Sequence, residues 1–176
     1  EPASLTPARV TGRGVFIAPS LLSLLSSRFT PIFAIVYTGR VKYRVYIETS
    51  IVSYLKGKPS TDTIVSAHQQ LTQTWWDERA PLFELLISEL VYQEASAGDP
   101  EAASARLTTL NNLKVLTVTE DAVSLAQLLV ANGPIHSEHA ADALHIAVAA
   151  VNGMDFLLTW NCKHLANAAL RGRITS

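Results

Sequence analysis

The chain has a single cysteine, Cys162, among 176 residues. One cysteine excludes an internal disulfide, and no Cys/His array has the spacing of a structural zinc site, so we expect a reducing, cytoplasmic setting. Charged residues are also few, at 16%, whereas hydrophobic residues make up 48%. This composition excludes a largely disordered chain and allows a substantial core, in a length that fits one domain.

A strong net charge is also lacking, because the formal charge is −1. This small total hides an asymmetry. Residues 1–44 carry six Lys or Arg against one acid, a net +5, and residues 45–176 carry eight against fourteen, a net −6. An acidic body does not attract phosphate by itself. If this part of the chain acts on nucleic acid, its negative charge must be offset by cations at the site or by the basic residues near the N-terminus.

Residues 1–42 differ in composition from the rest, and we interpret them as an irregular or appended leader. Within them, residues 15–37 are apolar but are interrupted by Pro19, Arg28 and Pro31. A membrane helix needs about 20 mostly apolar residues, so this run is a marginal candidate. A targeting or membrane role is the alternative to an appended segment, but we do not expect a membrane partner.

From Tyr43 onwards, strand-like and helix-like segments alternate along the chain. Short runs rich in branched and aromatic residues predict strands, and segments with apolar residues at helical spacing predict helices. This order favours an α/β fold with a central parallel sheet covered by helices on both faces. The predicted strands are 43–48, 81–88, 114–118 and 154–160, and the predicted helices are 50–57 (a short helix or turn), 63–80, 89–97, 100–112, 120–132, 137–153 and 163–172.

Helix starts are marked by residues whose side chains accept hydrogen bonds from the first backbone amides of a helix. Asp62, Ser88, Asp99 and Thr119 each precede a predicted helix, and Pro100 occupies the favoured first position of one. These residues set the predicted N-terminal boundaries of four helices.

Three acids lie at places that a structural role alone does not readily explain. Glu48 ends the first strand, Glu94 lies in the helix after the second strand, and Asp142 lies in the apolar segment AADALHIAVAAV. Because function gathers at the carboxyl ends of parallel strands, these acids can converge on one rim of the sheet. A carboxylate in an apolar helix is costly unless it is paired or binds a cation.

No run of Lys or Arg lies near these acids to neutralise them. Hard divalent cations prefer oxygen ligands, and carboxylates around such an ion are what metal-assisted phosphodiester hydrolysis requires. Each acid also has a simpler interpretation. Glu48 can be a surface acid at a strand end, Glu94 a solvated helix residue, and Asp142 a partner of His139 or His145. We interpret His145 as a core histidine that is bonded to backbone or to an acid.

Four segments together carry a resemblance to a known family: YIETSIVSYL, ISELVYQEASAG, AADALHIAVAAV and FLLTWNCKHLAN, in this order. They resemble PIN domains, and most of all the toxin ribonucleases of VapC-type toxin–antitoxin pairs, over about residues 43–170. The resemblance implies a three-layer α/β/α sandwich, RNA cleavage that depends on Mg²⁺ or Mn²⁺, and control by an antitoxin bound near the site.

The resemblance also implies a role for each matching residue. The helix acid of the family falls on Glu94, with Glu89 as the competing choice. The first acid falls on Glu48, where the family more often has Asp. The fourth position, usually Asp, is Asn161, an amide that can ligate a metal without charge. The implied metal ligands are Glu48, Asp142 and Asn161, and Glu94 would bind a second ion through water or orient the attacking water. The implied hydroxyls near the metal and the scissile phosphate are Thr49, Ser50 and Thr159.

We therefore predict a PIN-like nuclease domain over residues 43–176, with the final edge strand of the family missing. The predicted function is a metal-dependent endoribonuclease that acts as the toxin of a toxin–antitoxin pair. The expected partners are RNA, a cognate antitoxin and a second copy of the chain. One alternative is a nuclease of the same fold that acts on structured RNA or single-stranded DNA. The other is a catalytically weak or inactive PIN-fold module that binds RNA or an antitoxin.

Overall fold

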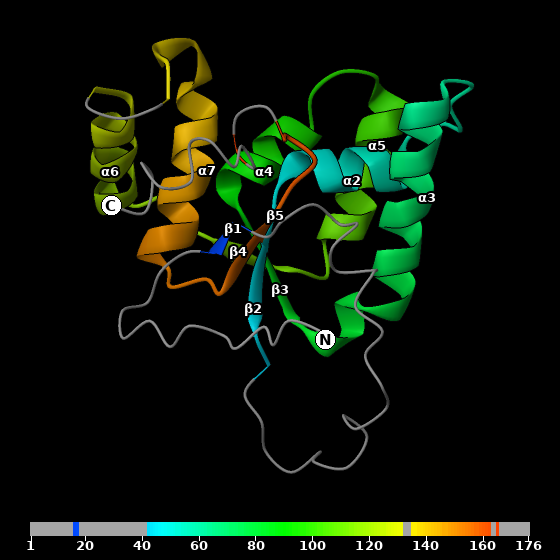
Figure 1. Cartoon of the computed structure of the whole chain (residues 1–176), viewed down its shortest axis with the longest axis horizontal. Helices are drawn as coiled ribbons and strands as arrows, with labels where there is room; N and C mark the ends of the chain where they lie inside the picture. Colours follow the sequence, from blue (N-terminus) through cyan, green and yellow to red (C-terminus); the bar gives the residue numbers. More distant parts are fainter. Residues whose placement is uncertain (1–15, 18–41, 132–134, 163–164, 166–176) are drawn as a thin grey trace, which may run out of the picture.

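The centre of the molecule is a parallel β-sheet with the strand order β1-β5-β2-β3-β4 (Figure 1). The structure is a computed structural model and describes residues 16–17, 42–131, 135–162 and 165. All neighbouring strands pair in parallel. The strands are β1 (Phe16–Ile17), β2 (Arg44–Ile47), β3 (Glu84–Ser88), β4 (Lys114–Leu116) and β5 (Phe156–Leu158).

Helices lie on both sides of this sheet, which confirms the predicted three-layer α/β/α arrangement. In Figure 1, α6 and α7 lie on one side of the sheet, and α2, α3 and α5 lie on the other. The helices are α2 (Thr49–Lys56), α3 (Thr63–Glu78), α4 (Glu89–Ala95), α5 (Pro100–Leu110), α6 (Glu120–Ala131) and α7 (Ala140–Val151), with short 3-10 turns η2 (Ala80–Leu82) and η3 (Ser137–His139).

The predicted helix starts are confirmed by their hydrogen bonds. The Asp62 carboxylate accepts from the backbone amides of Ile64 and Val65 at 2.9 Å, which caps α3. Ser88 caps α4 and Asp99 caps α5 in the same way. A side-chain acceptor at this position satisfies amides that have no partner within the helix. Local sequence therefore decides where each of these helices begins.

The leader contributes one short strand, which the sequence prediction did not include. Phe16 and Ile17 pair in parallel with Phe156 and Leu157 of β5. A strand at this position satisfies backbone groups that would otherwise lie at a sheet edge. Apart from Lys42, the rest of the leader lies outside the described residues, as does all but Leu165 of the predicted helix 163–172, so the division into leader and domain stays a prediction.

The central strand β2 is buried on both faces, as expected for a parallel strand under two helical layers. Val45, Tyr46 and Ile47 of β2 are each 2% exposed or less. On α3, Trp75 is also buried and stacks on Phe83 with a centroid distance of 6.1 Å. The core therefore runs through the strands whose carboxyl ends carry the candidate acids.

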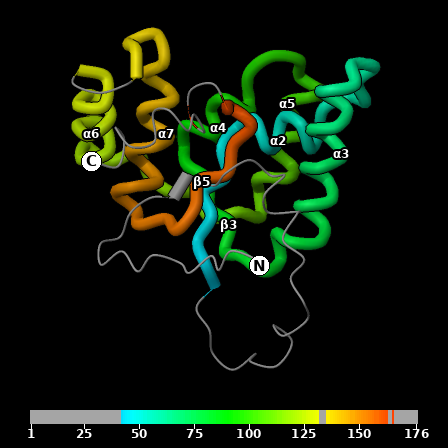
Figure 2. The backbone as a smooth tube through the Cα atoms, in the orientation of Figure 1, coloured from blue at the N-terminus to red at the C-terminus, as the bar shows by residue number. Residues whose placement is uncertain are grey.

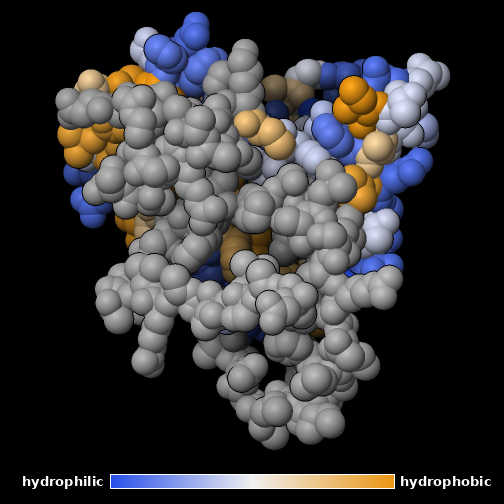
Figure 3. Space-filling view, viewed as in Figure 1, coloured by the Kyte–Doolittle hydropathy of each residue, from blue (hydrophilic) through white to orange (hydrophobic). Residues whose placement is uncertain are grey.

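The outer surface mixes polar and apolar residues. On the face shown in Figure 3, apolar patches alternate with polar ones along the side occupied by α3. In the part of the chain that the structure describes, no helix is both long enough and apolar enough to span a bilayer.

Candidate active site

The candidate site begins where two neighbouring strands end. β2 and β5 run side by side toward the edge where α2 begins (Figure 2). The backbone amide of Glu48 donates to the carbonyl of Leu158 at 3.0 Å, so Glu48 and Thr159 follow adjacent strand ends. Parallel pairing thus brings an acid and a hydroxyl together from segments that are far apart in the chain.

The Glu48 side chain is buried and held by hydroxyl groups. Its Oε2 accepts a 2.7 Å hydrogen bond from Thr159 Oγ1 and another from Ser50 Oγ. Glu48 occupies the N-cap position of α2, yet its side chain makes no capping bond. The residue is only 7% exposed. This burial argues against the simpler interpretation of Glu48 as a surface acid.

The second carboxylate at this edge belongs to Glu94 on α4. Its Oε2 accepts from Thr49 Oγ1 and lies 3.2 Å from His145 Nε2. Burial would raise the pKa of Glu94, but the hydrogen bonds from His145 and Thr49 lower it below its ordinary value. Glu94 is therefore held as a carboxylate at neutral pH.

Glu48, Glu94 and His145 form the close group of this site. Each offers one ligand atom, and these atoms all lie within 4.8 Å of one another. Across the described residues, no lysine or arginine forms an ion pair with Glu48 or Glu94. Two carboxylates this close, without a lysine or arginine partner, fit a hard divalent cation such as Mg²⁺ or Mn²⁺, whose preferred ligands are oxygens.

Asp142 and Asn161 form a second pair beside this group. Asn161 Nδ2 donates to Asp142 Oδ1 at 2.9 Å, and His139 Nδ1 lies 3.9 Å from Asp142 Oδ2. The backbone amide of Asn161 also donates to Thr159 Oγ1 at 2.8 Å, which links the pair to Glu48. The implied ligand set of Glu48, Asp142 and Asn161 is thus connected through Thr159. Asp142 is not a member of the close group, whereas Glu94 is.

The structure also separates the two candidate helix acids. Glu89 lies in the first turn of α4 and accepts a 3.1 Å hydrogen bond from the backbone amide of Val118. Glu94, five positions later, contacts Thr49 and His145 instead. Of the two residues, Glu94 is the one that this geometry brings to Glu48.

The three hydroxyl residues named from the resemblance lie at this edge, each bonded to a carboxylate. Thr49 donates to Glu94, and both Ser50 and Thr159 donate to Glu48. Ser50 Oγ also accepts from the backbone amide of Trp160 at 2.8 Å. These contacts fix the orientation of both carboxylates.

The site includes two further residues, His145 and Tyr46, to which the sequence analysis gave no role in binding or catalysis. His145 was expected to bond to backbone or to an acid, and it bonds to Glu94 and to Tyr46. Tyr46 was predicted only to lie in a strand. Because strand side chains alternate between faces, a residue two positions before Glu48 lies on the same side of the sheet as Glu48, and its hydroxyl was an available signal.

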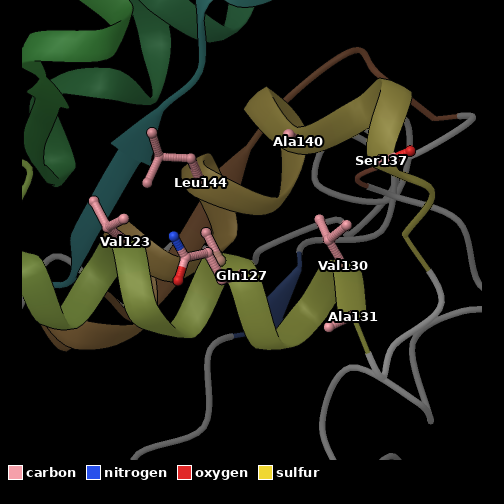
Figure 4. A pocket seen from close by; sticks show the side chains of 8 residues that line it. Val123, Gln127, Val130, Ala131, Ser137, Ala140 and Leu144 are labelled. Carbon is pink, nitrogen blue, oxygen red and sulfur yellow. The ribbon is translucent and has the colours of Figure 1, made fainter.

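The structure has an apolar hollow elsewhere, between α6 and α7 (Figure 4). Its volume is about 350 Å³, and neither Glu48, Glu94 nor His145 lines it. The hollow is therefore distinct from the carboxylate edge. The lining residues are Val123, Ala126, Gln127, Val130, Ala131, Ser137, Ala140 and Leu144.

Comparison with known proteins bears on the fold. No protein-family model and no curated protein sequence matches the chain. Among solved structures, the chain is similar to VapC20 of Mycobacterium tuberculosis, described as a Sarcin-Ricin loop cleaving toxin. That likeness has a TM-score of 0.55 and 18% identity, and covers 70% of this chain and 95% of that one.

A second solved structure gives a weaker likeness. It is VapBC2 of Rickettsia felis bound to a DNA fragment from their promoter, with a TM-score of 0.44 and 16% identity, over 68% of this chain and 89% of that one. A score this low supports no conclusion. The fold class defined by the sheet order and the first comparison is a PIN-like α/β/α fold, which confirms the fold that the resemblance implied.

Proposed function

We propose that this protein is a metal-dependent endoribonuclease that hydrolyses RNA phosphodiester bonds with Mg²⁺ or Mn²⁺. The observation that carries the proposal is the convergence of the buried Glu48 and of Glu94 within 4.8 Å at the carboxyl edge of the sheet. Like charges this close repel each other unless a cation lies between them. The same edge is where α/β proteins bind their ligands.

In this proposal the residues of the chain hold and orient the reactants. Glu48 and Glu94 would hold the cation, and Asp142 with Asn161 would complete the ligand set from the adjoining side. A bound divalent cation would neutralise the scissile phosphate and activate a water molecule. The hydroxyl of Thr49 donates to Glu94, and those of Ser50 and Thr159 donate to Glu48. These three hydroxyls would thus orient the carboxylates and take no part in forming or breaking bonds.

The reaction itself is a hydrolysis. Glu94 would orient a water molecule for in-line attack on phosphorus. The new oxygen–phosphorus bond forms as the bond to the 3′ oxygen breaks. The products are a 5′-phosphate and a 3′-hydroxyl, and the water supplies both the attacking oxygen and the proton taken up by the leaving group.

The finer proposal is that the chain is the toxin of a toxin–antitoxin pair and acts in the cytoplasm. The support is the PIN-like fold shared with VapC20, a protein described as a Sarcin-Ricin loop cleaving toxin, at a sequence identity that shows the fold alone. The test is growth of a bacterial host that expresses the chain. We expect growth arrest that Glu48→Gln abolishes, and equal arrest by the variant would contradict the proposal.

A second candidate is a PIN-fold module that binds RNA or an antitoxin without cleaving. The observation in its favour is Asn161, which places an uncharged amide where the family usually has an acid and pairs it with Asp142. Fewer charges at the site weaken the hold on a cation. The two candidates therefore differ in whether millimolar Mn²⁺ supports cleavage.

The deciding experiment is cleavage of single-stranded RNA by the purified full chain, with Mn²⁺ and with EDTA. We expect cleavage with Mn²⁺, none with EDTA, and loss of cleavage in Glu48→Gln and Glu94→Gln. The matched control is Glu89→Gln, a change of the same chemistry on the same helix, which should cleave normally. Cleavage that survives EDTA would refute the metal-dependent mechanism, and a folded chain without activity would favour the binding module.

A further inference from the structure

A continuous row of buried hydrogen bonds runs behind the candidate site. Ser88 Oγ lies 2.7 Å from the hydroxyl of Tyr46, and that hydroxyl lies 2.9 Å from His145 Nδ1. On the other side of the imidazole ring, Nε2 lies 3.2 Å from Glu94 Oε2. Ser88 and Tyr46 are fully buried and His145 is 1% exposed. The row therefore joins β3, β2 and α7 to the carboxylate on α4.

The chemistry of the two ends gives this row a direction. Glu94 is a carboxylate and can only accept, so His145 Nε2 must carry a hydrogen. In a neutral ring Nδ1 is then an acceptor, and the hydroxyl of Tyr46 donates to it. The Tyr46 oxygen in turn accepts from the hydroxyl of Ser88. Each group in the row has a partner in this arrangement.

Tyr46 is placed to be the donor, because the residue is fully buried and its hydroxyl lies 2.9 Å from Nδ1 of His145. A buried hydroxyl with a fixed proton can select which ring nitrogen of a neighbouring histidine is protonated.

We propose that Ser88 and Tyr46 hold His145 in the tautomer protonated at Nε2, and that His145 in turn positions the Glu94 carboxylate for metal binding. His145 and Tyr46 are positioning residues, because Glu94 is the group that would touch the cation. The effect on metal binding and cleavage rests on the proposed function. The tautomer itself does not, since it follows from the hydrogen bonds of the metal-free protein.

Positioning of this kind has a measurable size in metal sites. Groups that orient a metal ligand from behind typically contribute 10- to 100-fold to metal affinity or activity. Both of the described hydrogen bonds to Glu94 end on Oε2. Its Oε1 receives no hydrogen bond from the described residues, so these residues hold the carboxylate through one oxygen and leave the other available to a cation.

The first experiment reads the tautomer by NMR of the metal-free full chain with nitrogen-15-labelled histidine. His145 is assigned by the loss of its signals in His145→Gln. We expect the wild-type ring to be neutral and protonated at Nε2. In Tyr46→Phe, which removes the donor to Nδ1, a mixture of tautomers is expected.

The matched control is Tyr92→Phe. Tyr92 lies on α4, and its exposed hydroxyl is 3.4 Å from Asn111 Oδ1, outside the row. This variant removes the same atom from a tyrosine and should leave the signals of His145 unchanged. A wild-type ring protonated at Nδ1 would overturn the proposal, because Nε2 would then carry a lone pair toward Glu48 and Glu94, as a metal ligand does.

The second experiment measures Mn²⁺ binding by calorimetry. We expect about tenfold weaker binding in His145→Leu and in Tyr46→Phe, with partial rescue in His145→Gln, whose amide can donate at a position close to that of Nε2. Unchanged Mn²⁺ affinity in Tyr46→Phe would overturn the positioning role. If Tyr46→Phe does not fold, the wild-type tautomer and the comparison of His145→Gln with His145→Leu decide the question.

The outcomes separate this inference from the proposed function. An Nε2-protonated ring and weakened Mn²⁺ binding in the variants, without any RNA cleavage, would support the positioning role and refute the nuclease. Cleavage together with an Nδ1-protonated ring would support the nuclease and refute the positioning role.

Discussion

Thr159 Oγ1 donates a 2.7 Å hydrogen bond to Oε2 of Glu48, which ties the end of β5 to the end of β2. The same oxygen of Thr159 accepts from the backbone amide of Asn161 at 2.8 Å. One hydroxyl therefore connects the buried acid of the close group to the Asp142–Asn161 pair. Its position makes Thr159 a test of how the two parts of the site depend on each other.

Replacement of Thr159 by valine should destabilise the metal-free protein. Valine has nearly the same shape but leaves the buried Glu48 carboxylate and the Asn161 amide each without this partner. Loss of a hydrogen bond to a buried polar group costs about 1–3 kcal/mol. Urea unfolding in EDTA measures the change. The control is Thr108→Val, where an exposed threonine of α5 loses a bond to the carbonyl of Ser104, and an equal loss there would contradict the expectation.

Glu48→Gln should leave the metal-free protein as stable as the wild type or more so. The glutamine oxygen can still accept from Thr159 and Ser50, and a negative charge close to Glu94 is removed. Stabilisation by Mn²⁺ should disappear, whereas the wild type gains about 2.7 kcal/mol at an ion concentration of 100 times Kd. Thermal unfolding with and without Mn²⁺ measures both effects. Full Mn²⁺ stabilisation of the variant would show that Glu48 is not a ligand.

The stability of the metal-free protein should depend on pH through Glu94. Its pKa is lower in the folded than in the unfolded chain, because the hydrogen bonds from His145 and Thr49 outweigh the effect of burial. The resulting stabilisation is present above the unfolded pKa of about 4.3 and is lost as the pH falls through the folded value.

The comparison with Glu94→Gln isolates this contribution, since a neutral amide mimics the protonated acid. Above about pH 5, the free energy of unfolding should be larger for the wild type than for the variant. The difference between them should shrink below about pH 4. Urea unfolding in EDTA over this range provides the data. A difference that is constant with pH would mean that the Glu94 charge does not contribute.

Asn161→Asp should change metal affinity and metal-free stability in opposite directions. The change removes the amide donor to Asp142 and places a second carboxylate beside the first. Like charges at this distance destabilise the metal-free fold, but the added negative oxygen strengthens cation binding. Calorimetry with Mn²⁺ and urea unfolding in EDTA measure the two effects. Weaker Mn²⁺ binding in this variant would place Asn161 outside the ligand set.

Much of the local structure could be predicted because its causes are local. Asp62, Ser88 and Asp99 cap the helices that the sequence predicted, since a cap needs only an acceptor next to the first turn. The strand at Phe16–Ile17 was not predicted, because two residues are too few to show the alternation of apolar and polar side chains that marks a strand.

The composition of the close group was predicted in part. Glu48 and Glu94 were both named as site residues, and both belong to the group. The role of Tyr46 was not seen, because a tyrosine within a buried strand usually contributes to the core, and its hydroxyl matters only where another polar group meets it. The pairing of Asp142 with Asn161 depends in the same way on the end of β5 lying near the start of α7.

From Arg44 onwards, the sequence alone determined the order of strands and helices, several helix starts, and the placement of acids at strand ends, because these follow from neighbours within a few positions. Only the tertiary structure decided which acids meet. The order β5-β2-β3 brings Thr159 to Glu48, and the positions of α4 and α7 bring Glu94 to His145. Contacts between segments this far apart depend on how the sheet is assembled, and no local pattern encodes that assembly.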